Sequence, residues 1–201
     1  LERSHTFAFA SDLHVGDSMT IGELESFCNQ VNESKAEFLI LGGDINDELS
    51  TYDDMVNTFK TLSTVKVPVY YVYGNHDRQP NAHYVGGRTY TDEQFKEAIE
   101  SNGITILSDK FVKVADDLVL LGREDLSRED RKAWADLENP YPDLPLIVAD
   151  HQPYDWEQLK VEKSALQLSG HTHVGQAWPL QYIYALTGYT TTYGEFDYPD
   201  T

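Results

Sequence analysis

The sequence predicts an α/β fold, and two observations indicate it. First, short apolar runs of strand length alternate with amphipathic segments of helical length along most of the chain. Second, residues 103–122 contain strand-like runs with no helix between them, so we expect parallel crossover units combined with an antiparallel part. No repeat or break in composition marks a second unit, and 201 residues are enough for one substantial core. We therefore expect a single domain over residues 1–201.

Eight apolar runs are expected to form the strands. They cover residues 6–11, 38–41, 69–73, 104–107, 111–114, 118–121, 146–149 and 166–169. Four capping-box patterns precede apolar faces at helical spacing, and each predicts that a helix begins there. They pair Thr20 with Glu23, Ser50 with Asp53, Thr91 with Gln94, and Ser127 with Asp130.

The composition excludes several classes of protein. Lys and Arg total 15 against 34 Asp and Glu, and a net charge of -19 repels phosphate backbones, so we expect no general nucleic-acid binding. The one cysteine, Cys28, rules out an internal disulfide framework. No apolar run approaches the ~18 residues that a membrane span needs, so we expect no span and no signal peptide within these residues.

Polar residues follow five of the expected strands, at the point where each strand ends. The motifs are SDLH with Asp12 and His14, GGDIND with Asp44 and Asp47, GNHD with Asn75, His76 and Asp77, ADH with Asp150 and His151, and SGHTH with His171 and His173. Ligand sites in open α/β sheets form at the carboxyl ends of the strands. We therefore expect these side chains to meet in one site.

Two of the motifs place their polar residues two positions apart. In an extended segment residues i and i+2 project to the same side, so Asp12 and His14 could reach one metal ion, as could His171 and His173. Each motif alone has an ordinary alternative as a turn, a helix cap or a hydrogen-bonded core histidine. However, five of the seven histidines fall in these motifs, and that concentration favours a metal centre.

The ordered motif set resembles that of the calcineurin-like metallophosphoesterases, over residues 7 to about 180. The segments LGREDLSRED, VADHQP and LQLSGHTHVGQAWP are most similar to a bacterial branch whose members often carry membrane-spanning segments or export signals before this domain. The resemblance implies a four-layer α/β/β/α sandwich with two mixed sheets and a dimetal site at the C-terminal strand ends. It also implies a soluble domain whose parent protein is membrane-attached or exported, through an anchor outside this chain.

The end of the chain departs from the family pattern. In these relatives further strands follow the region that matches TTYGEFDYPDT, where this chain stops at Thr201. Either this branch is shorter, or the chain lacks the last strands of a longer parent.

The resemblance also implies which residues hold two divalent metal ions. One ion would be held by Asp12, His14 and His173, the other by Asn75, His151 and His171, with Asp44 bridging them. Mixed imidazole, carboxylate and amide ligands suit Mn, Fe or Zn better than Ca, and we favour Mn.

The implied reaction is phosphoester hydrolysis, in which a hydroxide bridging the two metals attacks phosphorus. By resemblance His76 faces the substrate and assists the leaving group, and Asp47 orients it, with Asp77 as the alternative. Arg123, in GRED, is the candidate for binding the substrate phosphate, although a surface ion pair with a neighbouring acid explains it equally well. Arg78 is a further candidate.

The preferred substrate is a phosphodiester of a small nucleotide or of a lipid-linked molecule. The alternatives are a phosphomonoesterase and a non-catalytic scaffold of the same fold. A nuclease of this fold would need a basic groove, which the charge of -19 disfavours.

Overall fold

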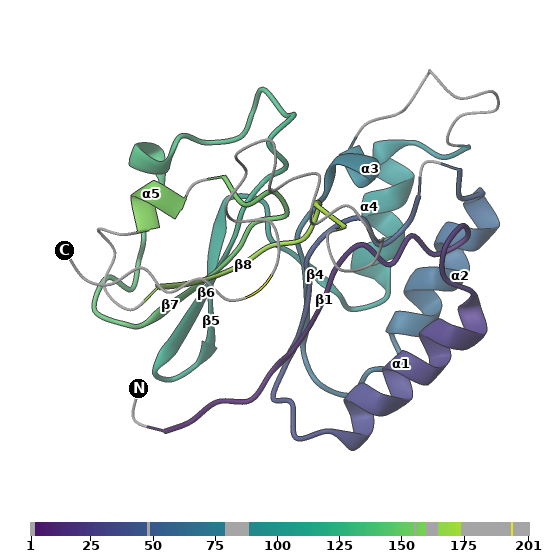
Figure 1. Ribbon diagram of the computed structural model, residues 1–201, viewed down its shortest axis with the longest axis horizontal. Helices are drawn as coiled ribbons and strands as arrows, with labels where there is room; N and C mark the ends of the chain where they lie inside the picture. The colour runs from purple at the N-terminus through teal and green to yellow at the C-terminus, as the bar shows by residue number, and fades with distance from the viewer. Residues whose placement is uncertain are drawn as a thin grey trace.

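The computed structural model describes residues 3–47, 49–78, 89–154, 156–159, 165–173 and 194. In these residues eight strands form two sheets (Figure 1). The first sheet has the order β1 (Ala8–Ala10), β2 (Leu39–Leu41), β3 (Val69–Tyr71), β4 (Thr105–Ile106). The second has the order β5 (Lys110–Ala115), β6 (Leu118–Gly122), β7 (Leu146–Ala149), β8 (Ala165–Leu168). Each of the eight expected runs overlaps one strand, so the prediction of an α/β fold is confirmed.

The two sheets differ in strand direction. In the second sheet β5 is antiparallel to β6, whereas β6, β7 and β8 are parallel, so this sheet is mixed as expected. All described pairs of the first sheet are parallel, and the expectation of two mixed sheets is therefore wrong for this part of the chain. The reason is that helical crossovers join its strands, and these return each strand in the same direction.

Three long helices cover one face of the first sheet, as Figure 1 shows. They are α1 (Ile21–Glu33), α2 (Tyr52–Leu62) and α4 (Asp92–Ser101). The short helices α3 (Asn75–Arg78) and α5 (Trp156–Leu159) follow β3 and β7. None of the helices in the described residues is both long and apolar enough to cross a membrane.

Two of the four predicted capping boxes are confirmed, at the starts of α1 and α4. The box before α2 is displaced by one residue, because Thr51 and Asp54 form it. Ser50 is buried instead, and its hydroxyl donates to the carbonyl of Val15 at 2.7 Å. The helix predicted from Ser127 does not form. The backbone N–H of Ser127 donates to the side chain of Asp125, and only the 3-10 turn η1 (Trp134–Asp136) follows.

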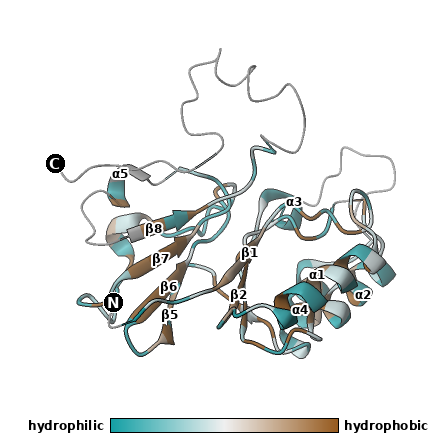
Figure 2. Cartoon of the chain, turned by 60° about the horizontal axis from the view of Figure 1, so that its bottom comes forward, coloured by the Kyte–Doolittle hydropathy of each residue, from teal (hydrophilic) through white to brown (hydrophobic). Residues whose placement is uncertain are grey.

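The core lies on both faces of the first sheet. Leu39 and Leu41 of β2 pack against the helices, whereas Ile40 between them packs against Leu120 and Ile147 of the second sheet. The strands β6 and β7 are accordingly coloured mainly as apolar in Figure 2. The outer face of the second sheet packs against residues of η1 and of the segment around it, together with Leu159 of α5. Helices, sheet and sheet thus form three successive layers.

The carboxyl ends of β1, β2 and β3 lie at one edge of the first sheet, because these strands are parallel and in register. The polar motifs begin within three residues of these ends, and directly after β7 and β8 of the second sheet. The expectation about missing final strands concerns what would follow TTYGEFDYPDT, and it stays untested; of residues 174–201 the structure describes only Gly194.

Candidate metal centre

The first cluster of candidate ligands combines residues from the beginning and the end of the chain. Asp12 and His14 follow β1, and His173 follows β8; one ligand atom from each lies within 4.8 Å of the others. Nε2 of His173 lies 3.3 Å from Nε2 of His14 and 3.3 Å from Oδ1 of Asp12. Two imidazoles and a carboxylate at this separation form a suitable ligand set for a transition metal.

The second cluster consists of Asp44, His151 and His171. Nε2 of His151 lies 2.9 Å from Oδ2 of Asp44, and Nδ1 of His171 lies 2.7 Å from the side-chain oxygen of Asn75. The backbone N–H of His171 also donates to Oδ1 of Asp12 at 2.9 Å, so this loop joins the two clusters. The structure therefore brings all seven residues expected as metal ligands to the same edge of the molecule.

One pair of atoms in the second cluster tests whether the residues fit a metal ion. Oδ2 of Asp44 and Nε2 of His151 are both buried and face each other at 2.9 Å, and neither bonds to any other group of the described residues. Nδ1 of His151 lies 2.8 Å from the carbonyl oxygen of Gly42 and donates to it, so Nε2 is the ring nitrogen that faces Asp44 and would be available to a metal. Buried polar atoms are nearly always satisfied, so this pair fits a shared cation.

The backbone at the ligands differs from the extended geometry we expected. Six described residues other than glycine have a positive φ, and five of them are candidate ligands: Asp12 (55°), His14 (45°), Asp44 (52°), His171 (70°) and His173 (49°). The expected extended geometry of residues i and i+2 is therefore wrong for both motif pairs. Left-handed backbone turns the side chains into the site, and such strain concentrates at functional positions.

Two glycines allow the loops of the site to approach one another. A Cβ added to Gly74 would lie 2.1 Å from Oδ1 of Asp44, and one added to Gly170 would lie 2.1 Å from Oδ2 of Asp12. Any residue with a Cβ would collide with the candidate ligand, so only glycine fits at these two positions.

Asp47 contacts two histidines with one oxygen. Its Oδ2 lies 2.9 Å from Nδ1 of His14 and 3.7 Å from Nδ1 of His76, and the rings of the two histidines meet edge to face with centroids 4.8 Å apart. Its other oxygen accepts a hydrogen bond from the backbone of Leu49. The expected pair of His76 and Asp47 is thus brought together, and the contact of Asp47 with His14 was not expected.

Asp77, the alternative partner of His76, is directed toward backbone groups. It is 2% exposed, and its Oδ2 accepts hydrogen bonds from the N–H groups of Gly74 and Asp44 at 2.8 and 2.9 Å. The contact with Gly74 has the i, i+3 spacing of a helix cap, a signal that could have been recognised in GNHD. The contact with Asp44 joins loops 33 residues apart and has no sequence signal.

Burial and close charges perturb the acids and bases of the second cluster. Burial alone would raise the pKa of the Asp44 carboxyl, but the contacts with His151 and His76 outweigh it and lower that pKa. Burial opposes protonation of His151 as well, and the neighbouring Asp44 nonetheless raises its pKa to about 9. Burial, then the charge of Asp44, raises the pKa of Asp77 to about 7. Burial, then His151, lowers the pKa of His171. A cation bound between Asp44 and His151 would replace the proton that these two side chains attract.

Arg123 does not join the candidate ligands. It is 1% exposed, its guanidinium donates to the Asp109 carboxylate and to the carbonyl of Lys132, and it lies 5.5 Å from the ring centroid of Trp134. In this position Arg123 holds the segment after β6 against the second sheet. Its carboxylate partner is Asp109, and not an acid that neighbours it in the sequence, as we had expected for an ion pair. Asp150 likewise binds an arginine, Arg131, through two hydrogen bonds of 3.0 and 2.7 Å.

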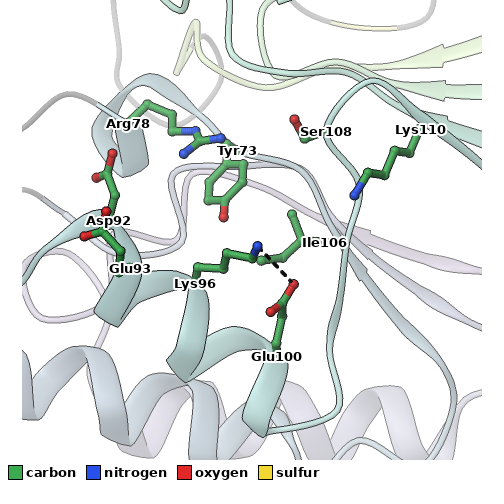
Figure 3. A pocket seen from close by; sticks show the side chains of 9 residues that line it. All are labelled: Tyr73, Arg78, Asp92, Glu93, Lys96, Glu100, Ile106, Ser108 and Lys110. Atoms are coloured by element: carbon green, nitrogen blue, oxygen red, sulfur yellow. Dashed lines mark ion pairs between the residues drawn. The ribbon is translucent and has the colours of Figure 1, made fainter. Parts of the chain in front are cut away.

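Arg78 lies beside the site but is also engaged. Its guanidinium lies 3.7 Å from the ring centroid of Tyr73 and donates to both carboxylate oxygens of Glu124. It borders a cleft of about 390 Å³ between α4 and the β4–β5 region, shown in Figure 3. Acidic and basic side chains share the walls of this cleft, and none of the candidate ligands lines it. A further residue that we did not anticipate is Ser11, whose hydroxyl donates to Oδ2 of Asp12.

The comparison with known proteins gives the family. A family model described as calcineurin-like phosphoesterase matches residues 5–175. The metallophosphoesterase YkuE of Bacillus subtilis is 30% identical over 183 residues, which are 83% of this chain and 57% of that protein. The phosphodiesterase YaeI of Escherichia coli is 28% identical over 84% of this chain and 60% of its own length. A zebrafish (Danio rerio) transmembrane protein with a metallophosphoesterase domain is 28% identical over 85% of this chain and 40% of its own length.

This chain therefore spans between two fifths and three fifths of the length of these relatives. Among solved structures, TT1561 of Thermus thermophilus superposes with a TM-score of 0.59 at 16% identity, covering 81% of this chain and 80% of that one, which shows a shared fold. Because the family model covers most of the 201 residues and includes every motif of the site, the chain belongs to the calcineurin-like phosphoesterase family.

Proposed function

We propose that this chain hydrolyses phosphoesters with the help of two divalent metal ions. The observation that carries the proposal is the buried pair formed by Oδ2 of Asp44 and Nε2 of His151, which face each other at 2.9 Å and bond to no other group of the described residues. Membership of the calcineurin-like phosphoesterase family supports the same reaction class.

The proposed ligands divide into two sets around a shared carboxylate. Asp12, His14 and His173 would hold one ion, Asn75, His151 and His171 the other, and Asp44 both. Imidazole, carboxylate and amide groups together favour Mn, Fe or Zn, with Mn as our first choice. The four-layer sandwich of the family, with this site at the strand ends, is the framework that we propose for the whole domain.

When bound, such ions supply an activated water and neutralise charge on the phosphoryl oxygens. The residues of the chain itself would then perform two tasks. His76, whose side chain is 26% exposed, would give a proton to the departing oxygen. Asp47 would hold the imidazole of His76 in place through Nδ1, from the same oxygen that contacts His14.

The substrate that we propose is a phosphodiester of a small nucleotide or of a lipid-linked molecule. The name of the Escherichia coli relative, phosphodiesterase YaeI, supports a diester, and the net charge of -19 disfavours a nucleic-acid polymer. The name of the zebrafish relative supports attachment of the parent protein to a membrane through a segment outside this chain.

The test is a metal titration followed by an assay. Protein stripped with EDTA is titrated with Mn²⁺, and hydrolysis of bis(p-nitrophenyl) phosphate is compared with that of p-nitrophenyl phosphate. We expect two ions per chain and faster hydrolysis of the diester. Preference for the monoester would make the chain a phosphomonoesterase. Absence of bound metal, with no hydrolysis of either ester after addition of Mn²⁺, would overturn the proposal.

A further inference from the structure

Two hydrogen bonds connect the loop after β2 with the loop after β3, and a third lies within the loop after β3. Oδ2 of Asp77 accepts from the backbone N–H of Asp44 at 2.9 Å and from that of Gly74 at 2.8 Å. In the opposite direction, the backbone N–H of His76 donates to Oδ1 of Asp44 at 2.9 Å. We call these three bonds the Asp44–Asp77 clasp.

The clasp decides which oxygen of Asp44 is available to a metal. Oδ1 accepts a hydrogen bond from the N–H of His76, which leaves Oδ2 directed at Nε2 of His151. Asp44 is 1% exposed and has a φ of 52°, a backbone conformation that a residue with a side chain rarely adopts. Its buried N–H needs an acceptor, and Asp77 provides one from the neighbouring loop.

We propose that Asp77 is a positioning residue for the metal centre, which acts through the acceptor oxygen that it offers to the backbone of Asp44. The inference rests on the proposed function, because it assigns the support of the carboxylate that both ions would share. Asp77 itself is neither a ligand nor the partner of His76 in this scheme. That partner is Asp47, whose Oδ2 lies 3.7 Å from Nδ1 of His76.

Two other roles for Asp77 make different predictions. If Asp77 only caps α3, its bond to Gly74 is sufficient and its loss leaves Asp44 in place. If Asp77 acts through its negative charge, an uncharged amide cannot replace it. The acceptor role predicts that an amide does replace it, because one side-chain oxygen accepts both N–H groups and the oxygen of asparagine can do the same.

The experiment compares Asp77→Asn with Asp77→Ala, and uses Tyr70→Phe as the matched control. Tyr70 also lies on β3, but its ring packs with Phe38 in the core between the two sheets, whereas the hydroxyl of Tyr71 interacts with Asp77 and is left intact. The first readout is the dissociation constant of Mn²⁺ from calorimetric titration. The second is hydrogen exchange of the Asp44 and Gly74 amides in EDTA, which requires neither metal nor activity. Asp77→Ser is a second variant that removes the long acceptor, in case the alanine variant does not fold.

We expect Asp77→Ala and Asp77→Ser to weaken Mn²⁺ binding by about 10- to 100-fold, the usual effect of removing a group that supports a ligand. Exchange of the two amides should accelerate at least about tenfold, whereas Asp77→Asn and Tyr70→Phe should stay within about threefold of the parent in both readouts. Unchanged binding and exchange in Asp77→Ala would overturn the proposal, and so would losses in Asp77→Asn as large as those in Asp77→Ala. A parent protein that fails to hydrolyse esters would refute the proposed function only, because amide exchange tests the clasp independently.

Discussion

The imidazole of His76 lies 3.7 Å from the carboxylate of Asp47, through an oxygen that also lies 2.9 Å from Nδ1 of the candidate ligand His14. One oxygen thus contacts a residue proposed to hold a metal and a residue proposed to assist the leaving group. The two histidines can therefore be separated by mutation, since only one of them belongs to a ligand cluster with Asp12 and His173.

Replacing His76 by alanine should preserve the metals and remove most of the activity. Its ring belongs to neither of the two proposed ligand sets, and among the candidate groups it lies only with His14 and Asp47. Loss of a positioned proton donor reduces kcat by about 10²- to 10⁴-fold. Metal content and kcat on bis(p-nitrophenyl) phosphate are the measurements. If the metals leave together with the ring, His76 is a ligand and its proposed role is wrong.

Asp47→Asn should reduce metal affinity and activity together. The amide removes the charge that faces Nδ1 of His14, and changes to such supporting carboxylates typically weaken metal binding by about 10- to 100-fold. The control is Asp53→Asn, at an exposed acid in the first turn of α2, which should change neither quantity. A loss of kcat at unchanged Mn²⁺ affinity would show that Asp47 serves His76 alone.

Gly74→Ala should disrupt the metal centre, because the new Cβ would lie 2.1 Å from Oδ1 of Asp44 and force the two loops apart. We expect weaker Mn²⁺ binding in calorimetry. Gly22→Ala is the matched control: nothing lies within 4 Å of its added Cβ, and in helix α1 alanine should raise the unfolding free energy by about 0.5–1 kcal/mol. Equal metal affinity in the two variants would contradict the close approach of the loops.

Arg123→Met should destabilise the protein without changing KM. The variant would leave the carboxylate of Asp109 buried without its cation, and breaking such a pair costs about 3–5 kcal/mol of unfolding free energy. Chemical denaturation and KM for the diester decide the role. A higher KM at unchanged stability would restore the original expectation that Arg123 binds the substrate phosphate.

Removal of metal should lower the melting temperature, because ions that bind only the folded state stabilise it by mass action. At a Mn²⁺ concentration 100 times the dissociation constant, one site contributes about 2.7 kcal/mol. Thermal melts in EDTA and after addition of Mn²⁺ measure the effect. In His151→Ala, which removes one atom of the buried pair with Asp44, the gain from Mn²⁺ should shrink, and an undiminished gain would place the metal elsewhere.

The strands and the site edge could be predicted from the sequence because both depend on local patterns. Apolar runs bounded by Gly, Asp and Ser identify buried strands, and parallel pairing then brings the residues after β1, β2 and β3 together. The helix expected from Ser127 does not form, and a local contact explains this too. Its backbone N–H is bound by Asp125 two residues earlier, a turn that competes with a helix cap.

Contacts between distant loops could not be predicted in this way. The buried partner of Arg123 is Asp109, 14 residues away, and Asp77 reaches Asp44 over 33 residues. Nothing in GRED or GNHD specifies these partners, since burial and pairing arise only when the two sheets pack. The left-handed backbone of Asp12 and His14 could not be predicted from the sequence either, because residues with a side chain normally adopt other conformations.

The five left-handed ligand positions have a consequence for engineering this domain. Each non-glycine residue held in that conformation costs about 1–2 kcal/mol, against a net stability of about 5–15 kcal/mol for a typical domain. A library selected for heat resistance alone would therefore enrich glycine or asparagine at these positions and discard the proposed ligands. Stabilised versions of this protein should be sought with positions such as Asp12, Asp44 and His171 held fixed.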